Sequence, residues 1–305
     1  AHGFRLVGEA GARTVPGRAL AGVPADEGPF DFVLLATQPT DVEAAARQAA
    51  PHLAPDGRMV CFQNGLCEER VAAVLGDRAR VVGGIVAWGA TMVEPGVFDK
   101  TSAGGFVVGR YDGAEDAALD PLCTLLESIG PVQRTANLAG ARWSKLALNC
   151  AVSTLGTLHG TALGPVLRSR RARRLALEIM SEVVEVARRA EVKLEKVAGT
   201  LDLDWMALTP AERATPGSVG LASKHAMVLA VGTRYRRLYS SMLRAIEAGK
   251  PPAIDFLNGE IAARGRQYEV PTPVNAAVTD AVKAIAAGRA QPGRPLVLSV
   301  YEETR

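Results

Sequence analysis

The chain has 305 residues, of which 48% are hydrophobic and 22% charged, and its formal net charge at pH 7 is +3. This length supports a sizeable core and predicts two domains rather than one. The small net charge gives no reason to expect nucleic acid or a membrane as a partner, and no apolar run reaches the length of a membrane span.

Apolar runs alternate with short helical patterns in the first third of the chain. Residues 31–37, "DFVLLAT", form a continuous apolar run between two prolines, which is typical of a strand buried on both faces. The runs at 58–63 and 80–88 each follow a helical pattern. This alternation predicts three adjacent parallel strands in a partial doubly wound, Rossmann-type α/β sheet. The segments 89–100 and 104–110 are then predicted to be antiparallel strands around a Pro-Gly turn.

The remainder of the chain has the periodicity of helices. We expect an irregular tail from Gly288, preceded by helices at 138–158, 171–192, 219–248, 252–268 and 273–287. The predicted domains are therefore residues 1–136, a dinucleotide-binding domain, and residues 137–305, an all-α domain that carries the substrate site and the catalytic residues.

A doubly wound domain suggests a dinucleotide, yet the glycine fingerprint G-x-G-x-x-G between a strand and a helix is absent. A mononucleotide-binding half normally begins with a strand, a glycine-rich turn and a helix. The sequence begins at "AHGF" without a methionine, so we expect that the first β-α-β unit is missing from it. The alternative is a different α/β fold that never contained this unit.

Two further features have ordinary structural interpretations. The basic run "RSRRARR", Arg168 to Arg174, is interpreted as the solvated start of an amphipathic helix rather than as a phosphate-binding patch. No cysteines form a CxxC pair and no metal site is expected. The cysteines are predicted to be buried free thiols in a reducing cytoplasm, namely Cys61, Cys67, Cys123 and Cys150.

The helix predicted at 138–158 carries two polar residues among apolar ones. Lys145 and Asn149 are four residues apart, which places them on one face. A desolvated lysine is a stronger acid than one in water, so it can give a proton to a carbonyl oxygen as hydride reaches the carbon. The alternative is that Lys145 extends its ammonium group to the surface along an apolar stem.

Four stretches resemble the ketopantoate reductases (2-dehydropantoate 2-reductases), which are NADPH-dependent enzymes with a Rossmann domain and a helical C-terminal domain. They are "FDFVLLATQPTDVEAA", "FQNGLCEE", "RWSKLALNCAVSTLGTLHG" and "SSMLRAIEAGKPPAIDFLNGEI". Together they extend from about residue 30 to residue 275. The pair K-x-x-x-N after a tryptophan, followed downstream by S-S-M-L and I-D-F-L-N-G, is the most specific part.

The resemblance implies roles for individual positions. Lys145 corresponds to the general acid and Asn149 to its companion, and Ser241 to the serine that contacts the substrate carboxylate. Residues expected beside the cofactor are Thr37, Gln38 and Asn64. Taken alone, Asn64 before Gly65 is also a plain turn signal, and Ser241 is an ordinary helix serine.

The sequence departs from the family pattern mainly on the substrate side. Ala253 stands where the family usually has a glutamate that binds the substrate hydroxyl. Ser153 and Leu238 stand where asparagines are found, and Gln38 replaces a lysine near the cofactor. Ser153, Leu238 and Ala253 remain the predicted substrate-binding positions. Since Leu238 and Ala253 offer no side-chain hydrogen bond, the pocket should prefer a more apolar 2-oxo acid than ketopantoate.

The sequence therefore predicts NAD(P)H-dependent reduction of a 2-oxo acid or related carbonyl. NADPH is the expected cofactor and NADH remains open, because the residue that distinguishes them follows the second strand of such a fold. The alternatives are an opine- or hydroxyacid-type dehydrogenase and a truncated, non-catalytic scaffold. Besides the small-molecule substrate, the default partner is a second copy of the chain in a homodimer.

Overall fold

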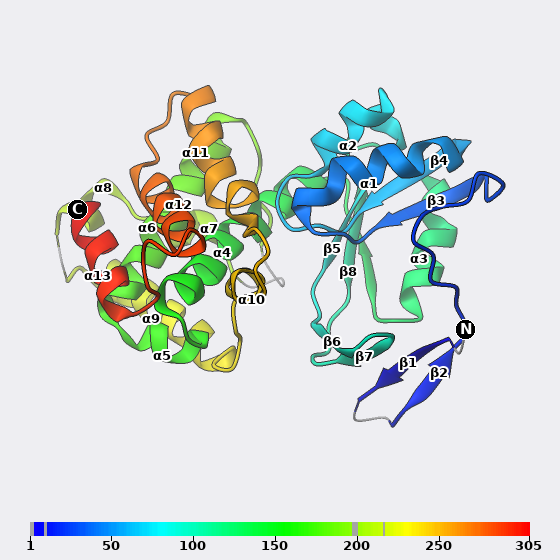
Figure 1. Cartoon of the computed structure of the whole chain (residues 1–305). Helices are drawn as coiled ribbons and strands as arrows, with labels where there is room; N and C mark the ends of the chain where they lie inside the picture. The colour runs from blue at the N-terminus through cyan, green and yellow to red at the C-terminus, as the bar shows by residue number, and fades with distance from the viewer. Residues whose placement is uncertain (1–2, 9–10, 197–200, 216) are drawn as a thin grey trace. The chain divides into compact units, whose positions relative to one another are not determined.

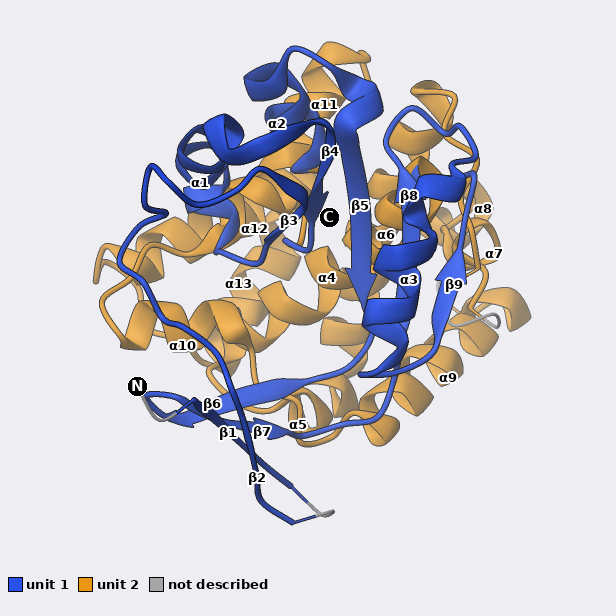
Figure 2. Cartoon of the chain, turned by 90° about the vertical axis from the view of Figure 1, so that its right-hand side faces the viewer, with its two compact units in different colours: residues 1–63, 67–138 blue, residues 64–66, 139–305 orange. Residues whose placement is uncertain are grey.

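The computed structural model describes residues 3–8, 11–196, 201–215 and 217–305. Its internal contacts divide the chain into two compact units, which Figure 2 shows in different colours. The first consists of residues 1–63 and 67–138, and the second of residues 64–66 and 139–305. The fold is an α/β unit with mixed sheets followed by an all-helical unit, which confirms the predicted fold class.

A five-stranded sheet forms the centre of the first unit, in the order β3-β4-β5-β8-β9. Strands β3, β4 and β5 are adjacent and parallel, as the sequence predicted, whereas β8 is antiparallel to β5 and β9 is parallel to β8. The strands are β3 (Phe30–Leu35), β4 (Leu53–Cys61), β5 (Val81–Val86), β8 (Phe106–Arg110) and β9 (Val132–Arg134).

Helices cover both faces of this sheet (Figure 1). The helices are α1 (Val42–Ala49), α2 (Glu68–Leu75) and α3 (Asp120–Glu127). Val60, Val82 and Val108 pack against Leu122 and Leu126 of α3, while α1 and α2 lie against β3, β4 and β5. Because successive strand residues point to opposite faces, β5 and the apolar end of β4, residues 59–61, supply both layers.

Strand β3 is less enclosed than its apolar sequence predicts. The side chain of Leu34 is 41% exposed, and Leu35 is the strand's buried residue. Among the described residues, β3 pairs with β4 only and lies at an edge of the sheet. The expectation of burial on both faces is therefore wrong for β3, because one of its faces is left partly open at Leu34.

A second sheet of four strands has the order β2-β1-β7-β6. Strands β6 and β7 form the hairpin predicted around Pro95 and Gly96. The strand predicted at 104–110 does not join that hairpin, because it is β8 of the five-stranded sheet and pairs with β5 instead. The strands of the second sheet are β1 (Phe4–Val7), β2 (Arg13–Val15), β6 (Ala90–Glu94) and β7 (Val97–Lys100).

The second unit is built from helices around one large apolar core. Helix α6 contributes most of its residues to that core, and α4 is buried on several sides. The helices are α4 (Leu138–His159), α5 (Leu163–Arg168), α6 (Arg170–Arg189), α7 (Leu203–Met206), α8 (Pro210–Ala214), α9 (Val219–Arg234), α10 (Ser241–Glu247), α11 (Asn258–Gln267), α12 (Pro273–Ala286) and α13 (Arg294–Glu303). Among the described helices, none is both long and apolar enough to cross a lipid bilayer.

Two helix predictions in this unit are wrong. The helix predicted at 219–248 is interrupted after Arg234, because the carbonyls of Arg236 and Leu238 accept hydrogen bonds from the start of α5. The segment after Gly288 is not an irregular tail, since it contains α13, whose Val297 and Val300 are buried in the core three residues apart. The prediction at 252–268 contains a 3₁₀ turn followed by α11.

The cysteines behave as predicted, because all four are buried in the first unit or in α4. None is part of a disulfide. Burial raises the pKa of the Cys150 thiol well above its usual value, so this side chain acts as a small apolar group in the core.

Candidate functional site

Helix α4 presents the predicted catalytic pair on one face. Lys145, Asn149 and Ser153 follow one another at intervals of four residues, and each is partly buried. The Nδ2 atom of Asn149 is buried and has no hydrogen-bond partner among the described residues. A buried amide nitrogen without a partner is costly. This amide lies one helical turn from Lys145.

The turn that carries Asn64 belongs to the helical unit. Residues 64–66 cluster with that unit, although the chain on either side belongs to the first. Gly65 has φ of +95°, and a Cβ there would lie 2.6 Å from the carbonyl oxygen of Phe256. Only glycine permits this close packing against the 3₁₀ turn Ala253–Phe256. Gly65 thus allows the turn to pack into the helical unit, which contains both Asn64 and Lys145.

The predicted cofactor residues Thr37 and Gln38 lie at the carboxyl end of β3. Both are exposed, and Gln38 precedes a 3₁₀ turn that begins at Pro39. Gln63, which follows β4, donates a hydrogen bond of 3.2 Å to the hydroxyl of Thr37. Ligands of open α/β sheets bind outside the carboxyl ends of parallel strands. The structure therefore brings the ends of β3 and β4 together at that edge.

Ser240 rather than Ser241 makes the contacts that anchor the S-S pair. Its hydroxyl caps α10 by accepting from the N–H of Leu243, and it donates to the carbonyl of Ser153 at 2.9 Å. The hydroxyls of Ser240 and Thr157 lie 2.8 Å apart. Ser241 is exposed as the first residue of α10. The sequence did not indicate Ser240, although a serine just before a helix is a known capping signal.

Asn258 is a second buried asparagine that the sequence analysis did not select. It accepts from Thr154 at 2.5 Å and donates to the carbonyl of Cys150 and to Asn275, at 3.2 and 2.9 Å. Its side chain is completely buried. The dipeptide "NG" is also a turn signal, so the sequence did not indicate that Asn258 is the first residue of α11.

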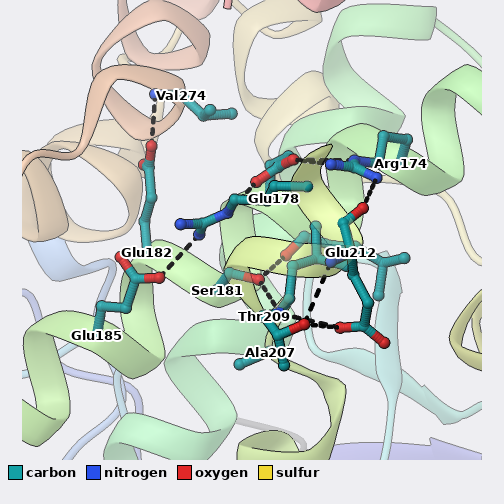
Figure 3. A network of polar contacts seen from close by, with 12 residues as sticks. Arg174, Glu178, Ser181, Glu182, Glu185, Ala207, Thr209, Glu212 and Val274 are labelled. Atoms are coloured by element: carbon teal, nitrogen blue, oxygen red, sulfur yellow. Dashed lines mark hydrogen bonds and ion pairs between the residues drawn. The ribbon is translucent and has the colours of Figure 1, made fainter. Parts of the chain in front are cut away.

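The hydrogen-bonded chain continues from Asn275 to Glu182 on α6. The Glu182 carboxylate accepts from the N–H groups of Val274 and Asn275, each at 2.8 Å, and from the Asn275 side chain at 2.7 Å. Figure 3 shows Glu182 directed at Val274 in the first turn of α12. Burial raises the pKa of Glu182 to about 7, although these three donors favour the charged form.

The substrate-side positions that depart from the family pattern, and Asp255 near them in sequence, differ in their exposure to solvent. Ala253 begins the 3₁₀ turn and is partly buried, whereas Leu238 is 47% exposed in the segment before α10. Asp255 is exposed and forms an ion pair of 2.7 Å with Lys283. Its role is thus to join the 3₁₀ turn to α12. The helical unit contains all the predicted site residues except Thr37 and Gln38, which belong to the first unit.

Curated relatives resemble most of this chain. A 2-dehydropantoate 2-reductase from Pyrococcus horikoshii is 24% identical over 255 residues, which are 83% of this chain and 75% of that protein. The 2-dehydropantoate 2-reductase of Halobacterium salinarum is 25% identical over 284 residues, which are 92% of this chain and 84% of that protein.

Solved structures show a similar fold. A ketopantoate reductase from Ralstonia eutropha JMP134 superposes with a TM-score of 0.77 at 24% identity, covering 94% of this chain and 86% of that one. A D-mandelate dehydrogenase with NADH and anilino(oxo)acetate also gives a TM-score of 0.77, at 18% identity and the same coverage.

Family models match both parts of the sequence. The model described as ketopantoate reductase PanE/ApbA matches residues 1–113, and the model of the C-terminal part of the same family matches residues 137–286. The chain therefore belongs to the ketopantoate reductase PanE/ApbA family.

Proposed function

We propose that this protein reduces the carbonyl group of a 2-oxo acid, with a nicotinamide cofactor as the hydride donor. The observation that carries the proposal is the buried, unpartnered Nδ2 of Asn149, one helical turn from Lys145. Membership of the ketopantoate reductase family and relatives named 2-dehydropantoate 2-reductase support it. The same relatives make ketopantoate one candidate substrate.

Proton delivery is the role proposed for Lys145. Its ammonium group gives a proton to the carbonyl oxygen while hydride adds to the carbonyl carbon, so the C=O electron pair becomes the O–H bond of the 2-hydroxy acid. Solvent then returns a proton to the amine. The amide of Asn149 donates a hydrogen bond that orients the carbonyl, and the exposed hydroxyl of Ser241 offers a neutral donor to the substrate carboxylate.

The carboxyl edge of the five-stranded sheet fits a nicotinamide cofactor. Thr37 and Gln38 are exposed there, and the hydrogen bond between Gln63 and Thr37 fixes the two strand ends relative to each other. We assign Thr37, Gln38 and Asn64 to cofactor binding. When bound, the cofactor supplies the hydride. The residues of this chain position the acceptor and supply the proton. NADPH is the expected form, and NADH is tested beside it.

The substrate pocket is proposed to favour an apolar 2-oxo acid. Ala253 and Leu238 provide apolar surface without side-chain hydrogen bonds, and Asp255 is engaged with Lys283. A substrate hydroxyl at this place would lose its water without gaining a charged partner, which costs roughly 1–3 kcal/mol. A branched apolar 2-oxo acid has no such group to desolvate.

The test is a kinetic survey of the product of the complete open reading frame. Ketopantoate, 2-oxoisovalerate, 2-oxoisocaproate and phenylglyoxylate are assayed with NADPH and with NADH, and kcat/KM is compared. We expect turnover of at least one apolar acid at an efficiency equal to that of ketopantoate or higher. Absence of turnover with every acid and both cofactors would support the non-catalytic scaffold instead.

A further inference from the structure

The helical unit contains a cavity of about 870 Å³ that the proposed reaction does not use. Its walls come from α6, α8, α9, α12, α13 and the segment between α11 and α12. No residue of α4 lines it, and neither does any residue assigned to the substrate or cofactor. Five arginines and three glutamates line it, together with apolar side chains that include Leu175, Leu221 and Val274.

The three carboxylates of this cavity are already engaged. Glu178 accepts from Arg174 at 2.7 Å and from Arg213 at 3.1 Å, and Glu185 accepts from Arg213 at 2.8 Å. Glu182 caps the first turn of α12. Figure 3 shows these contacts along α6. The acidic side chains therefore balance Arg174 and Arg213, and no carboxylate of the described residues pairs with the other guanidinium groups of the wall.

Arg170 and Arg171 are two arginines of the cavity wall that these carboxylates do not balance, and both are exposed to solvent. Within the described part of the chain, neither forms an ion pair with a carboxylate. Both lie in the first turn of α6, a 20-residue helix with no acidic residue in that turn. The positive end of the helix dipole adds to their charge. The basic run does begin a helix as the sequence predicted, but these two arginines also line a cavity.

His225 supplies an independent indication of a ligand. This side chain of α9 lines the cavity, is 8% exposed, and its Nδ1 is buried without a hydrogen-bond partner among the described residues. Burial, together with the charges of Arg173, Arg170 and Arg174, lowers the pKa of His225 to about 4. The imidazole is therefore neutral at pH 7, with an N–H on one of its two ring nitrogens.

We propose that this cavity binds an organic oxyanion, a carboxylate or phosphate ester with an apolar body. Arg170 and Arg171 hold the oxyanion, and the N–H of His225 donates a further hydrogen bond. The apolar body lies against Leu175 and Leu221. The site would thus combine two cationic side chains with a neutral imidazole and apolar wall residues.

Calorimetric titration of the purified protein at pH 7 tests the proposal with four probes. Phenyl phosphate and benzoate carry the two candidate oxyanions, benzyl alcohol lacks the charge, and inorganic phosphate lacks the apolar body. We expect saturable binding of phenyl phosphate or benzoate with Kd on the order of 1 mM, a value typical of ligands of this size. The stronger of these two probes identifies the oxyanion. Benzyl alcohol should not bind, and inorganic phosphate should bind at least about tenfold more weakly.

Variants locate the site. The double variant Arg170→Gln/Arg171→Gln should weaken binding about tenfold or more. Arg189→Gln, a change on the same helix that does not line the cavity, should leave binding unchanged. His225→Phe should also weaken binding about tenfold, while its melting temperature without ligand stays equal or rises because an unpartnered buried nitrogen is removed.

Several results would overturn the proposal. One is no saturable binding of either organic anion up to about ten times the expected Kd. Another is equal affinity for inorganic phosphate and phenyl phosphate, because the apolar wall would then contribute nothing. The third is binding that survives in Arg170→Gln/Arg171→Gln but disappears in Lys145→Ala, which would place the probe in the proposed active site.

Discussion

Asn149 and Asn258 offer a matched test of the proposed active site, because Asn149 lies on α4 and Asn258 contacts α4, but their hydrogen bonding differs. Nδ2 of Asn149 has no partner among the described residues, whereas Asn258 makes three hydrogen bonds and is fully buried. Leucine has a similar shape and removes the polar atoms. We therefore compare Asn149→Leu with Asn258→Leu in both stability and activity.

Asn149→Leu should lower activity without lowering stability, whereas Asn258→Leu should lower stability. Asn149→Leu removes a buried amide that gains nothing in the free protein, so its free energy of unfolding should stay the same or rise by about 1 kcal/mol. Its kcat/KM should fall roughly 10- to 100-fold, which is the loss of one or two kcal/mol of transition-state binding. Asn258→Leu leaves the hydroxyl of Thr154, the carbonyl of Cys150 and the Oδ1 of Asn275 without this partner. At roughly 1 kcal/mol or more for each, it should lose about 3 kcal/mol of stability.

Urea unfolding and steady-state kinetics on the same preparations measure both quantities. Activity is measured on the fraction that remains folded, which separates loss of structure from loss of chemistry. The reasoning is refuted if Asn149→Leu destabilises the protein as strongly as Asn258→Leu. It is also refuted if Asn149→Leu retains full kcat/KM, because the unpartnered amide would then have no role in substrate binding.

Three further predictions concern chemistry, specificity and pH. Lys145→Ala should lower kcat by roughly 10²–10⁴-fold with little change in cofactor affinity, and near-normal turnover would remove Lys145 from the mechanism. Ala253→Glu should shift the ratio of kcat/KM for ketopantoate over 2-oxoisovalerate upward by about tenfold or more, and a wild type that already favours ketopantoate by about a hundredfold would show that Ala253 does not determine specificity. The pKa of Glu182 is raised to about 7 from 4.5, so its stabilising contribution is present below about pH 4.5 and is lost as pH rises through 7. Relative to Glu182→Gln, wild type should therefore lose up to about 3 kcal/mol of unfolding free energy across that range, and a constant difference between the two would show that the N–H donors fully offset burial.

Local pattern was sufficient to predict the parallel strands and most of the long helices. The end of β4, residues 59–61, and nearly all of β5 are apolar and buried, and α4 and α6 have uninterrupted helical sequences. The break between α9 and α10 was not predictable in this way. It depends on Arg236 and Leu238, whose carbonyls accept from a segment about 70 residues earlier in the chain. Tertiary hydrogen bonds outweigh helix propensity at that point.

In the candidate site, too, local sequence pattern could not predict residues whose role depends on distant partners. Lys145 and Asn149 were recognisable because polar residues at helical spacing stand out among apolar neighbours. Ser240 and Asn258 were not, since their importance comes from partners on α4 that are 87 and 108 residues away in sequence. No local pattern distinguishes a buried, bonded asparagine from one in an exposed turn. Whether the chosen residues act in catalysis remains a prediction for the variants above.

Helix α4 carries its anchoring hydrogen bonds and the proposed catalytic pair on different strips, so the tests above can distinguish a structural role from a catalytic one. Thr154 and Cys150 bond Asn258 of α11, and Thr157 bonds Ser240 at the start of α10, so this side fixes the helix within the unit. Lys145 and Asn149 lie on a neighbouring strip that the core covers only partly. A catalytic group needs a fixed position but also an unsatisfied hydrogen-bonding capacity that the substrate can use. One helix can provide both only if its anchoring bonds and its reactive groups occupy different strips, and α4 has that arrangement.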